Sequence, residues 1–186
     1  MPQAANPDEQ TVINATREWL EKAVIGLNLC PFAKSVHVRN RIRYCVSSAD
    51  NGDQVLADLR SELRFLHSAD PEVMETTLLM VPQIFADFLE FNAFLDSAEA
   101  CLDELGLVGE IQIASFHPAY QFAGTEADDV TNFTNRSPFP TLHLLREASL
   151  EAALKSFSRP ESIYEDNIAT MRRLGPEGWK RLWIKG

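Results

Sequence analysis

The sequence has no hydrophobic run long enough to cross a membrane, and its beginning does not resemble a signal peptide. A membrane-spanning helix needs roughly 18 or more consecutive apolar residues, and no stretch of this chain approaches that length. The first six residues have neither the basic start nor the apolar core of a secretory signal. We therefore expect a cytoplasmic protein that does not associate with membranes.

Cysteine is scarce, and recognised catalytic signatures are missing. The three cysteines, Cys30, Cys45 and Cys101, are an odd number and form no C-x-x-C pair. This spacing indicates neither a disulfide framework nor a cysteine-rich zinc site. The chain also has no glycine-rich phosphate loop and no nucleophile elbow. No motif therefore names a reaction.

Basic residues are outnumbered by acidic ones, 17 to 27, which gives a net charge of −10. This balance argues against nucleic acid as a partner. Residues 34–43 are the exception, because they carry Lys34, Arg39, Arg41 and Arg43 without an acidic residue. A basic segment on an acidic body could bind a small anion, or it could be the solvated edge of a strand. The sequence leaves both interpretations open.

The apolar pattern predicts a single α+β domain over residues 1–186. Helical and strand-like segments follow one another in the order α-β-α-β-α-β-β-α-α, which predicts one mixed sheet of about four strands with helices packed on it. A ferredoxin-like arrangement is one sheet of this kind. The last two strands could pair antiparallel. The predicted strands lie at residues 41–47, 76–81, 109–116 and 141–147, and the predicted helices at residues 6–26, after the turn at 48–53, and at 85–105, 149–157 and 160–174.

The connection between the last two predicted strands, residues 117–140, is long for a compact domain, where most connections span about 4–6 residues. Disorder is not expected, because four aromatic residues are spread along it: Tyr120, Phe122, Phe133 and Phe139. It also gathers side chains that bind or react, with one His, two Asp, two Asn and one Arg. We therefore expect a functional loop.

Histidines at the two ends of this loop are candidate catalytic groups. If the flanking strands pair antiparallel, His117 lies near His143. Together with Asp129, these imidazoles could perform acid–base chemistry or bind a divalent metal. The spacing matches no compact metal-binding motif, so the cofactor stays unknown. The alternative is that the histidines are structural.

Cys30 is a third kind of candidate, because it precedes Pro31, a residue that suits the first position of a helix. If a helix begins there, Cys30 caps it, and the positive helix end would lower the thiol pKa and favour a nucleophile. The alternative is a small buried hydrophobic residue. Cys45 and Cys101 are expected to be packing residues.

Arg136 suits the capture of a carboxylate or phosphate group. Other candidate ligand contacts are polar or aromatic residues of the loop and of the basic segment: Asn132, Asn135, Ser137, Tyr120, Arg39 and Arg41. The alternative is that Asn and Ser side chains tie the loop to its own backbone.

Three stretches resemble a bacterial protein family of unknown function, number 1415: G-L-N-L-C-P-F-A at 26–33, S-F-H-P-A-Y-Q-F-A-G-T at 115–125 and T-N-R-S-P-F-P-T-L-H-L-L-R-E at 134–147. The similarity covers essentially the whole chain. It implies a bacterial single-domain protein of about this length, without an activity. It marks motif positions but gives them no roles: Cys30, His117, Asp129, Asn135, Arg136 and His143.

Two functional hypotheses follow. In the first, the protein is an enzyme for a small anionic substrate, with His117 as general acid or base, Asp129 as its orienting partner and Arg136 as anion clamp. In this hypothesis His143 is a second acid–base group or a metal ligand, and Cys30 a nucleophile. In the second, the protein is a non-catalytic module that binds a metabolite or a protein. The sequence does not decide the oligomeric state.

Overall fold

The computed structural model describes residues 7–155 and 162–183. Its four strands form one mixed sheet, which confirms the predicted α+β class. The elements are α1 (Glu9–Trp19), the π-helix η1 (Leu20–Ile25), α2 (Ala33–Val38), β1 (Ile42–Val46), α3 (Gly52–Ser68), β2 (Thr76–Met80), α4 (Phe88–Glu104), β3 (Ile111–Phe116), the 3-10 helix η2 (Val130–Asn135), β4 (Thr141–Arg146), α5 (Glu147–Lys155) and α6 (Ile163–Arg181).

The strand order in the sheet is β1-β2-β4-β3. β1 and β2 are parallel and are joined by α3, whereas β4 is antiparallel to both of its neighbours, β2 and β3. The predicted antiparallel pairing of the last two strands is therefore confirmed. The chain order β-α-β-α-β-β differs from the β-α-β-β-α-β order of a ferredoxin-like arrangement, because α3 and α4 both precede the final strand pair.

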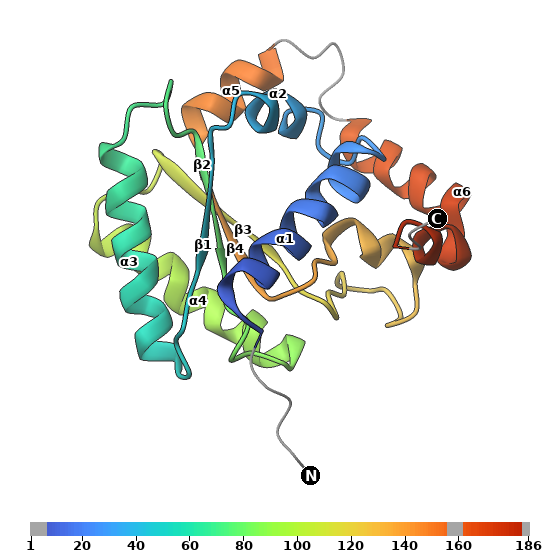
Figure 1. Ribbon diagram of the computed structural model, residues 1–186, viewed down its shortest axis with the longest axis horizontal. Coiled ribbons are helices and arrows are strands. Elements are labelled where there is room, and N and C mark those ends of the chain that lie inside the picture. The colour runs from blue at the N-terminus through green and yellow to red at the C-terminus, as the bar shows by residue number, and fades with distance from the viewer. Residues whose placement is uncertain (1–6, 156–161, 184–186) are drawn as a thin grey trace.

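Helices cover both faces of the sheet (Figure 1). One face, called here the α3/α4 face, packs against α3 and α4 through side chains such as Leu79 and Leu142. The opposite face, called the α1 face, packs against α1 and η1 through Leu78 and Tyr44. Neighbouring residues on β2 thus point to opposite faces, as the alternation of a strand requires.

Helix boundaries differ from the predictions by a few residues. Asp8 caps α1, accepting a hydrogen bond from the backbone N–H of Thr11; the predicted cap, Asn6, lies outside the described residues. Asp87 caps α4, so this helix begins three residues after the predicted start at Phe85. The predicted first residues of these helices are too early in the chain. Neighbouring residues fit the first turn of a helix equally well, so the pattern does not define the boundary to the residue.

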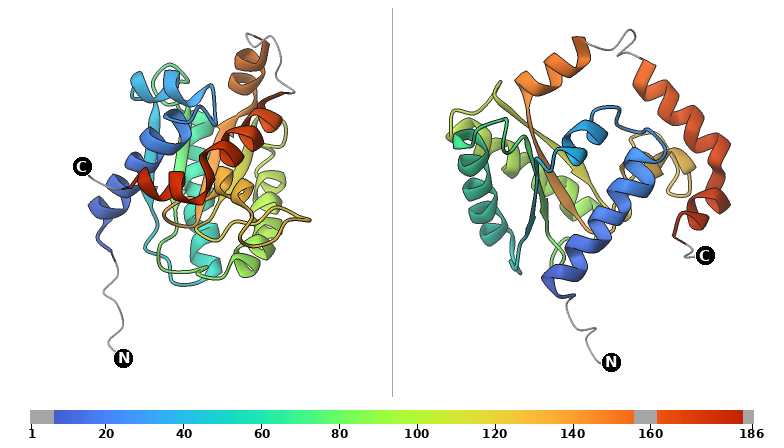
Figure 2. Two further views of the ribbon diagram at one scale, coloured as in Figure 1. Left: turned by 90° about the vertical axis from the view of Figure 1, so that its right-hand side faces the viewer. Right: turned by 45° about the horizontal axis from the view of Figure 1, so that its top comes forward.

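The last two helices, α5 and α6, lie on the same side of the sheet as α1 (Figure 2). α5 begins at Glu147, directly after β4, rather than at residue 149; its predicted end at 157 and the predicted helix start at 160 lie outside the described residues. α6 contacts η2, where Trp179 stacks on Phe133 with ring centroids 5.1 Å apart. Gly175 interrupts α6 with a positive φ of 64°, at the predicted helix stop. Among the described helices, none is both long and apolar enough to cross a bilayer.

Candidate functional site

His117 and His143 lie on opposite faces of the sheet. Ala114 of β3 pairs with His143 of β4, and paired residues share a face. His143 therefore lies on the α1 face with Ala114 and Phe116. His117 follows Phe116 and turns to the α3/α4 face, where it stacks on Phe91 with ring centroids 5.4 Å apart. The structure does not bring the two histidines together.

His117 joins two backbone segments. Its side chain is 1% exposed, and the backbone N–H of Ala119 donates to Nδ1 at 3.0 Å. Nε2 must then carry the hydrogen, and it donates to the carbonyl oxygen of Phe85 at 2.8 Å. Phe85 has a φ of 64°, which is uncommon for a bulky residue. Burial lowers the pKa of His117, so the ring is neutral, and its two hydrogen bonds stabilise this turn.

Asp129 and Asn132 bind the loop's own backbone rather than His117. Asp129 caps η2, because Oδ1 accepts a hydrogen bond from the backbone N–H of Thr131 at 2.9 Å. This bond lowers the pKa of the Asp129 carboxyl. Asn132 is fully buried; Oδ1 accepts from the N–H of Phe122, and Nδ2 donates to the carbonyl of Glu126. Both side chains stabilise the loop conformation.

Three further loop candidates also make internal contacts. The Asn135 amide donates to the carbonyl oxygen of Ser115 at 3.5 Å. The Ser137 hydroxyl donates to the carbonyl oxygen of Phe139 at 2.6 Å. The Tyr120 ring packs against α4, and burial raises the pKa of its hydroxyl. These contacts are those expected of residues that hold a long loop to the body.

Arg136 also bonds to the loop backbone. Nε donates to the carbonyl oxygen of Tyr120 at 3.2 Å, and Nη2 donates to that of Ala127 at 2.6 Å. The guanidinium lies over the Phe133 ring, 4.5 Å from its centroid, and burial lowers the pKa of Arg136. Arg136 and Glu18 both line an open hollow of about 500 Å³, together with Trp19, Trp179 and Trp183. A bound anion there would meet a carboxylate as well as the guanidinium.

Two of the four cations in the basic segment, Arg41 and Arg43, are paired with acidic residues from elsewhere in the chain. Arg41 Nη2 lies 2.7 Å from Glu72 Oε2, and Arg43 makes two hydrogen bonds of 2.6 and 3.0 Å to Glu62. Arg39 is exposed just after α2. β1, which follows, is an edge strand of the sheet. These contacts match the strand-edge interpretation of the segment better than an anion site.

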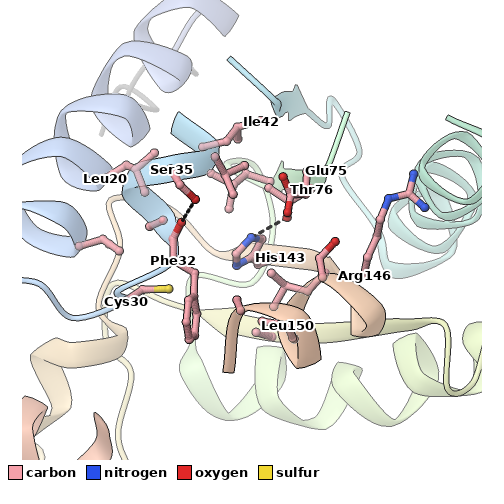
Figure 3. A pocket seen from close by; sticks show the side chains of 18 of the residues that line it. Leu20, Cys30, Phe32, Ser35, Ile42, Glu75, Thr76, His143, Arg146 and Leu150 are labelled. Atoms are coloured by element: carbon pink, nitrogen blue, oxygen red, sulfur yellow. Dashed lines mark hydrogen bonds between the residues drawn. The ribbon is translucent and has the colours of Figure 1, made fainter. Parts of the chain in front are cut away.

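Cys30 is not a helix cap. α2 begins at Ala33, and Phe32 is the residue at its N-cap position. Burial raises the pKa of the Cys30 thiol, whereas the predicted helix-end position would have lowered it. That prediction is therefore corrected: the thiol is neutral and lies in an apolar wall (Figure 3). Cys45 and Cys101 pack with the core on the α3/α4 face, as predicted, and burial raises the pKa of Cys45 to about 12.

The Cys30 side chain opens onto a cavity of about 230 Å³ on the α1 face, called here the His143 pocket (Figure 3). Its floor is the sheet, its walls come from η1, α2 and α5, and most of its side chains are apolar. The floor consists of Ile42, Thr76, Leu78, Ala114, Phe116, His143 and Leu145. The walls consist of Trp19, Leu20, Val24, Cys30, Phe32, Ala33, Ser35, Val36, Ser149, Leu150 and Ala153, with Glu75 and Arg146 at the remaining side. Cys30 and His143, 113 positions apart in the sequence, thus line one pocket.

The hydrogen bonds of Thr76 define the protonation of His143. Thr76 Oγ1 lies 2.6 Å from the carbonyl oxygen of Leu144, which cannot donate, so the single hydroxyl hydrogen points there. Thr76 Oγ1 also lies 2.8 Å from Nε2 of His143. Nε2 must therefore carry the hydrogen of that second bond, and Nδ1 keeps its lone pair.

The surroundings of His143 keep the ring neutral. Burial among apolar side chains lowers the pKa of His143 to about 4. The ring retains partial exposure, but it belongs to the lining of the pocket. Its accessible surface therefore faces an apolar cavity, where a cation is poorly solvated. The result is a neutral imidazole whose second nitrogen, Nδ1, is a hydrogen-bond acceptor on the cavity side of the ring (Figure 3).

The three candidate metal ligands, His117, His143 and Asp129, do not form one cluster. His117 uses both ring nitrogens on backbone atoms, and Asp129 is bonded to Thr131. Within residues 7–155 and 162–183, no group of three or more His, Cys, Asp or Glu side chains could hold a metal ion.

Sequence reasoning missed Thr76 as a site residue. The available signal was its place at the start of a buried strand, where a hydroxyl needs a partner. That partner was hidden because β2 and β4 are neighbours in the sheet but not in the sequence. Their register places Leu78 opposite His143 and so puts Thr76 and His143 on one face.

Comparison with known proteins gives a family and no function. Neither the curated proteins nor the solved structures contain a match. A family model described as protein of unknown function (DUF1415) matches residues 11–181. The match extends over α1 to α6 and includes every wall of the His143 pocket. The chain therefore belongs to the DUF1415 family.

Proposed function

We propose that this protein is a binding module for a small, neutral and mostly apolar molecule, which lies in the His143 pocket. The observation that carries the proposal is a cavity of about 230 Å³ between the sheet and three helices, with mostly apolar walls. Small-molecule sites are concave and mainly hydrophobic, with a few polar groups that orient the ligand. His143 and Cys30 are such groups here, and Thr76 holds the His143 ring by a hydrogen bond.

The size of the pocket suits a small ligand. A cavity of about 150 Å³ lined by apolar side chains can hold benzene. The His143 pocket therefore has room for a single ring with a substituent, or for an aliphatic molecule of similar volume. A much larger metabolite would require its walls to move.

Charge in the pocket argues against an anionic ligand. Arg146 extends away from the cavity toward α3 (Figure 3), and its Nη2 donates to the carbonyl oxygens of Leu66 and Ala69. Glu75, on the same side, carries a negative charge and lies 3.9 Å from Arg41. Arg146 lines the pocket, and its buried Nε has no hydrogen-bond partner among the described residues. An anion beside it would also meet the Glu75 carboxylate and would lose its hydration, which is costly. The anionic-substrate hypothesis would also need His117, Asp129 and Arg136 to leave their present contacts.

Toluene binding, followed by two-dimensional NMR and by thermal melting, tests the proposal. Saturation at about a hundred times the dissociation constant stabilises a protein by roughly 2.7 kcal/mol, and the shifted resonances should belong to pocket residues. Ala153→Trp should fill the cavity from α5 and abolish binding. Ala152→Trp is the matched control, because Ala152 is the exposed neighbour on the same helix. No response in the unmodified protein, or equal binding in both variants, would contradict the proposal.

A thiol-dependent enzyme is the second candidate, because Cys30 and His143 line the same pocket. A nucleophilic thiol beside an imidazole is a known catalytic arrangement. The raised pKa of Cys30 predicts the opposite behaviour, namely slow alkylation near neutral pH. The rate of iodoacetamide labelling, with Cys30→Ser as the reference for the other cysteines, decides between the two. Labelling faster than that of free cysteine would favour the enzyme.

A further inference from the structure

We infer that the ligand of the His143 pocket carries a hydroxyl or N–H group, whose hydrogen bonds to Nδ1 of His143. The inference rests on the proposed function and specifies the chemical class of the ligand: a neutral, ring-sized molecule with one hydrogen-bond donor, such as a phenol. It also assigns Thr76 the role of a positioning residue, which selects this class through its hydrogen bond to His143.

The selection begins with a chain of two hydrogen bonds. The Leu144 carbonyl takes the only hydrogen of the Thr76 hydroxyl at 2.6 Å, and the Thr76 oxygen then accepts from Nε2 of His143 at 2.8 Å. Thr76 is 6% exposed, so water does not readily replace either bond. The second ring nitrogen, Nδ1, therefore presents a lone pair and no hydrogen.

A lone pair in an apolar cavity discriminates among ligands. A hydroxyl or N–H satisfies it, whereas a methyl group leaves it without a partner once water is displaced. A carboxylate or an ether oxygen brings a second lone pair toward it, which is repulsive. Of the other polar side chains in the lining, the Ser35 hydroxyl already donates to the carbonyl of Phe32, and the Cys30 thiol is a weak hydrogen-bonding group. The Glu75 carboxylate, at the remaining side of the pocket, lies 3.9 Å from Arg41.

Phenol and toluene form a suitable pair of probes, because they differ by a hydroxyl in place of a methyl group. The quantity to measure is the ratio of their dissociation constants, determined by NMR titration of the full chain. In the unmodified protein, phenol is expected to perturb the ¹⁵N resonance of His143 Nδ1, because that nitrogen accepts a hydrogen bond. Toluene is expected to leave this resonance almost unchanged.

Two substitutions remove the selection by different routes. His143→Phe eliminates the acceptor and keeps a ring, so the phenol-to-toluene preference should fall about tenfold, which corresponds to about 1.4 kcal/mol. Thr76→Val keeps the shape of Thr76 but frees His143 to place its hydrogen on either nitrogen, and it should also lower the preference. Thr76→Ser retains the hydroxyl, and His67→Phe changes an exposed histidine on α3; both should leave the preference unchanged.

The outcomes separate this inference from the proposed function. If toluene binds and the preference falls in His143→Phe and Thr76→Val but not in the controls, the inference is supported. If toluene binds in the pocket but the preference is the same in every variant, the inference is overturned and the binding function remains. If neither probe binds the unmodified protein, both are overturned. If His143→Phe does not fold, the phenol-to-toluene preference measured in Thr76→Val still decides whether the inference is supported or overturned.

Discussion

The neutral state of His143 should make the stability of the protein depend on pH. The pKa of His143 falls from an ordinary 6.5 to about 4 in the folded protein. As the pH drops below about 6.5, His143 therefore binds a proton in the unfolded chain but stays neutral in the folded protein. The free energy of unfolding should fall in this window, from pH 6.5 down to pH 4. At about 1.4 kcal/mol per pKa unit, the full loss is about 3 kcal/mol, with roughly 2 kcal/mol already lost at pH 5.

Urea unfolding at pH 7 and pH 5 measures this loss, and His143→Gln supplies the reference without a titrating group. Carboxylates with lowered pKa values, such as Asp129, also lose stability in acid, but they do so equally in both proteins. The unmodified protein should lose about 2 kcal/mol more than His143→Gln. NMR should show a neutral His143 ring at pH 5. Equal losses in the two proteins, together with a His143 pKa near 6.5, would refute the reasoning that an apolar pocket surrounds the ring.

Two further predictions concern stability. Gly26→Ala should destabilise the protein by about 1–3 kcal/mol, because an added Cβ would lie 2.3 Å from the backbone oxygen of Lys22; Gly52→Ala, where the nearest atom is 3.8 Å away, should be nearly neutral. Similar urea midpoints for the two variants would show that the crowding at Gly26 is easily relieved. Arg43→Met should cost about 1.5–3 kcal/mol, the range for hydrogen bonds to a charged group, because it leaves the buried carboxylate of Glu62 without its partner. A loss below about 1 kcal/mol, the range of surface ion pairs, would mean that water reaches Glu62.

The sequence supported the fold class because its local patterns agree with the final structure. Alternating residues in β1 and the leucine stripe of α3 both face neighbouring elements, as their periods of two and 3.6 predict. Helix starts were less certain, since α4 begins at Phe88, after its cap Asp87, rather than at residue 85. Local propensity decides which element forms, whereas the neighbouring backbone decides where it begins.

The candidate site residues lie in two different settings, for an identifiable reason. Cys30 and His143 were named and do line one pocket, but residues 117–140 drew attention mainly through their density of polar side chains. In the structure, Asn132 and Arg136 use those polar groups on nearby backbone atoms. A long loop needs such bonds for its own order, and sequence alone does not distinguish them from groups that bind a ligand.

The sequence by itself therefore determined the four strands, most of the helices and the class of the fold, and it named Cys30 and His143 as candidates. The tertiary structure decided which faces those residues occupy. Side chains alternate along a strand, so a register shift of one residue would have moved His143 to the other face. That register depends on β2, whose Thr76 lies 67 residues from His143 in the chain. The tautomer and pKa of His143 follow from this distant hydroxyl and from burial, and both arise only when the sheet and its helices have packed together.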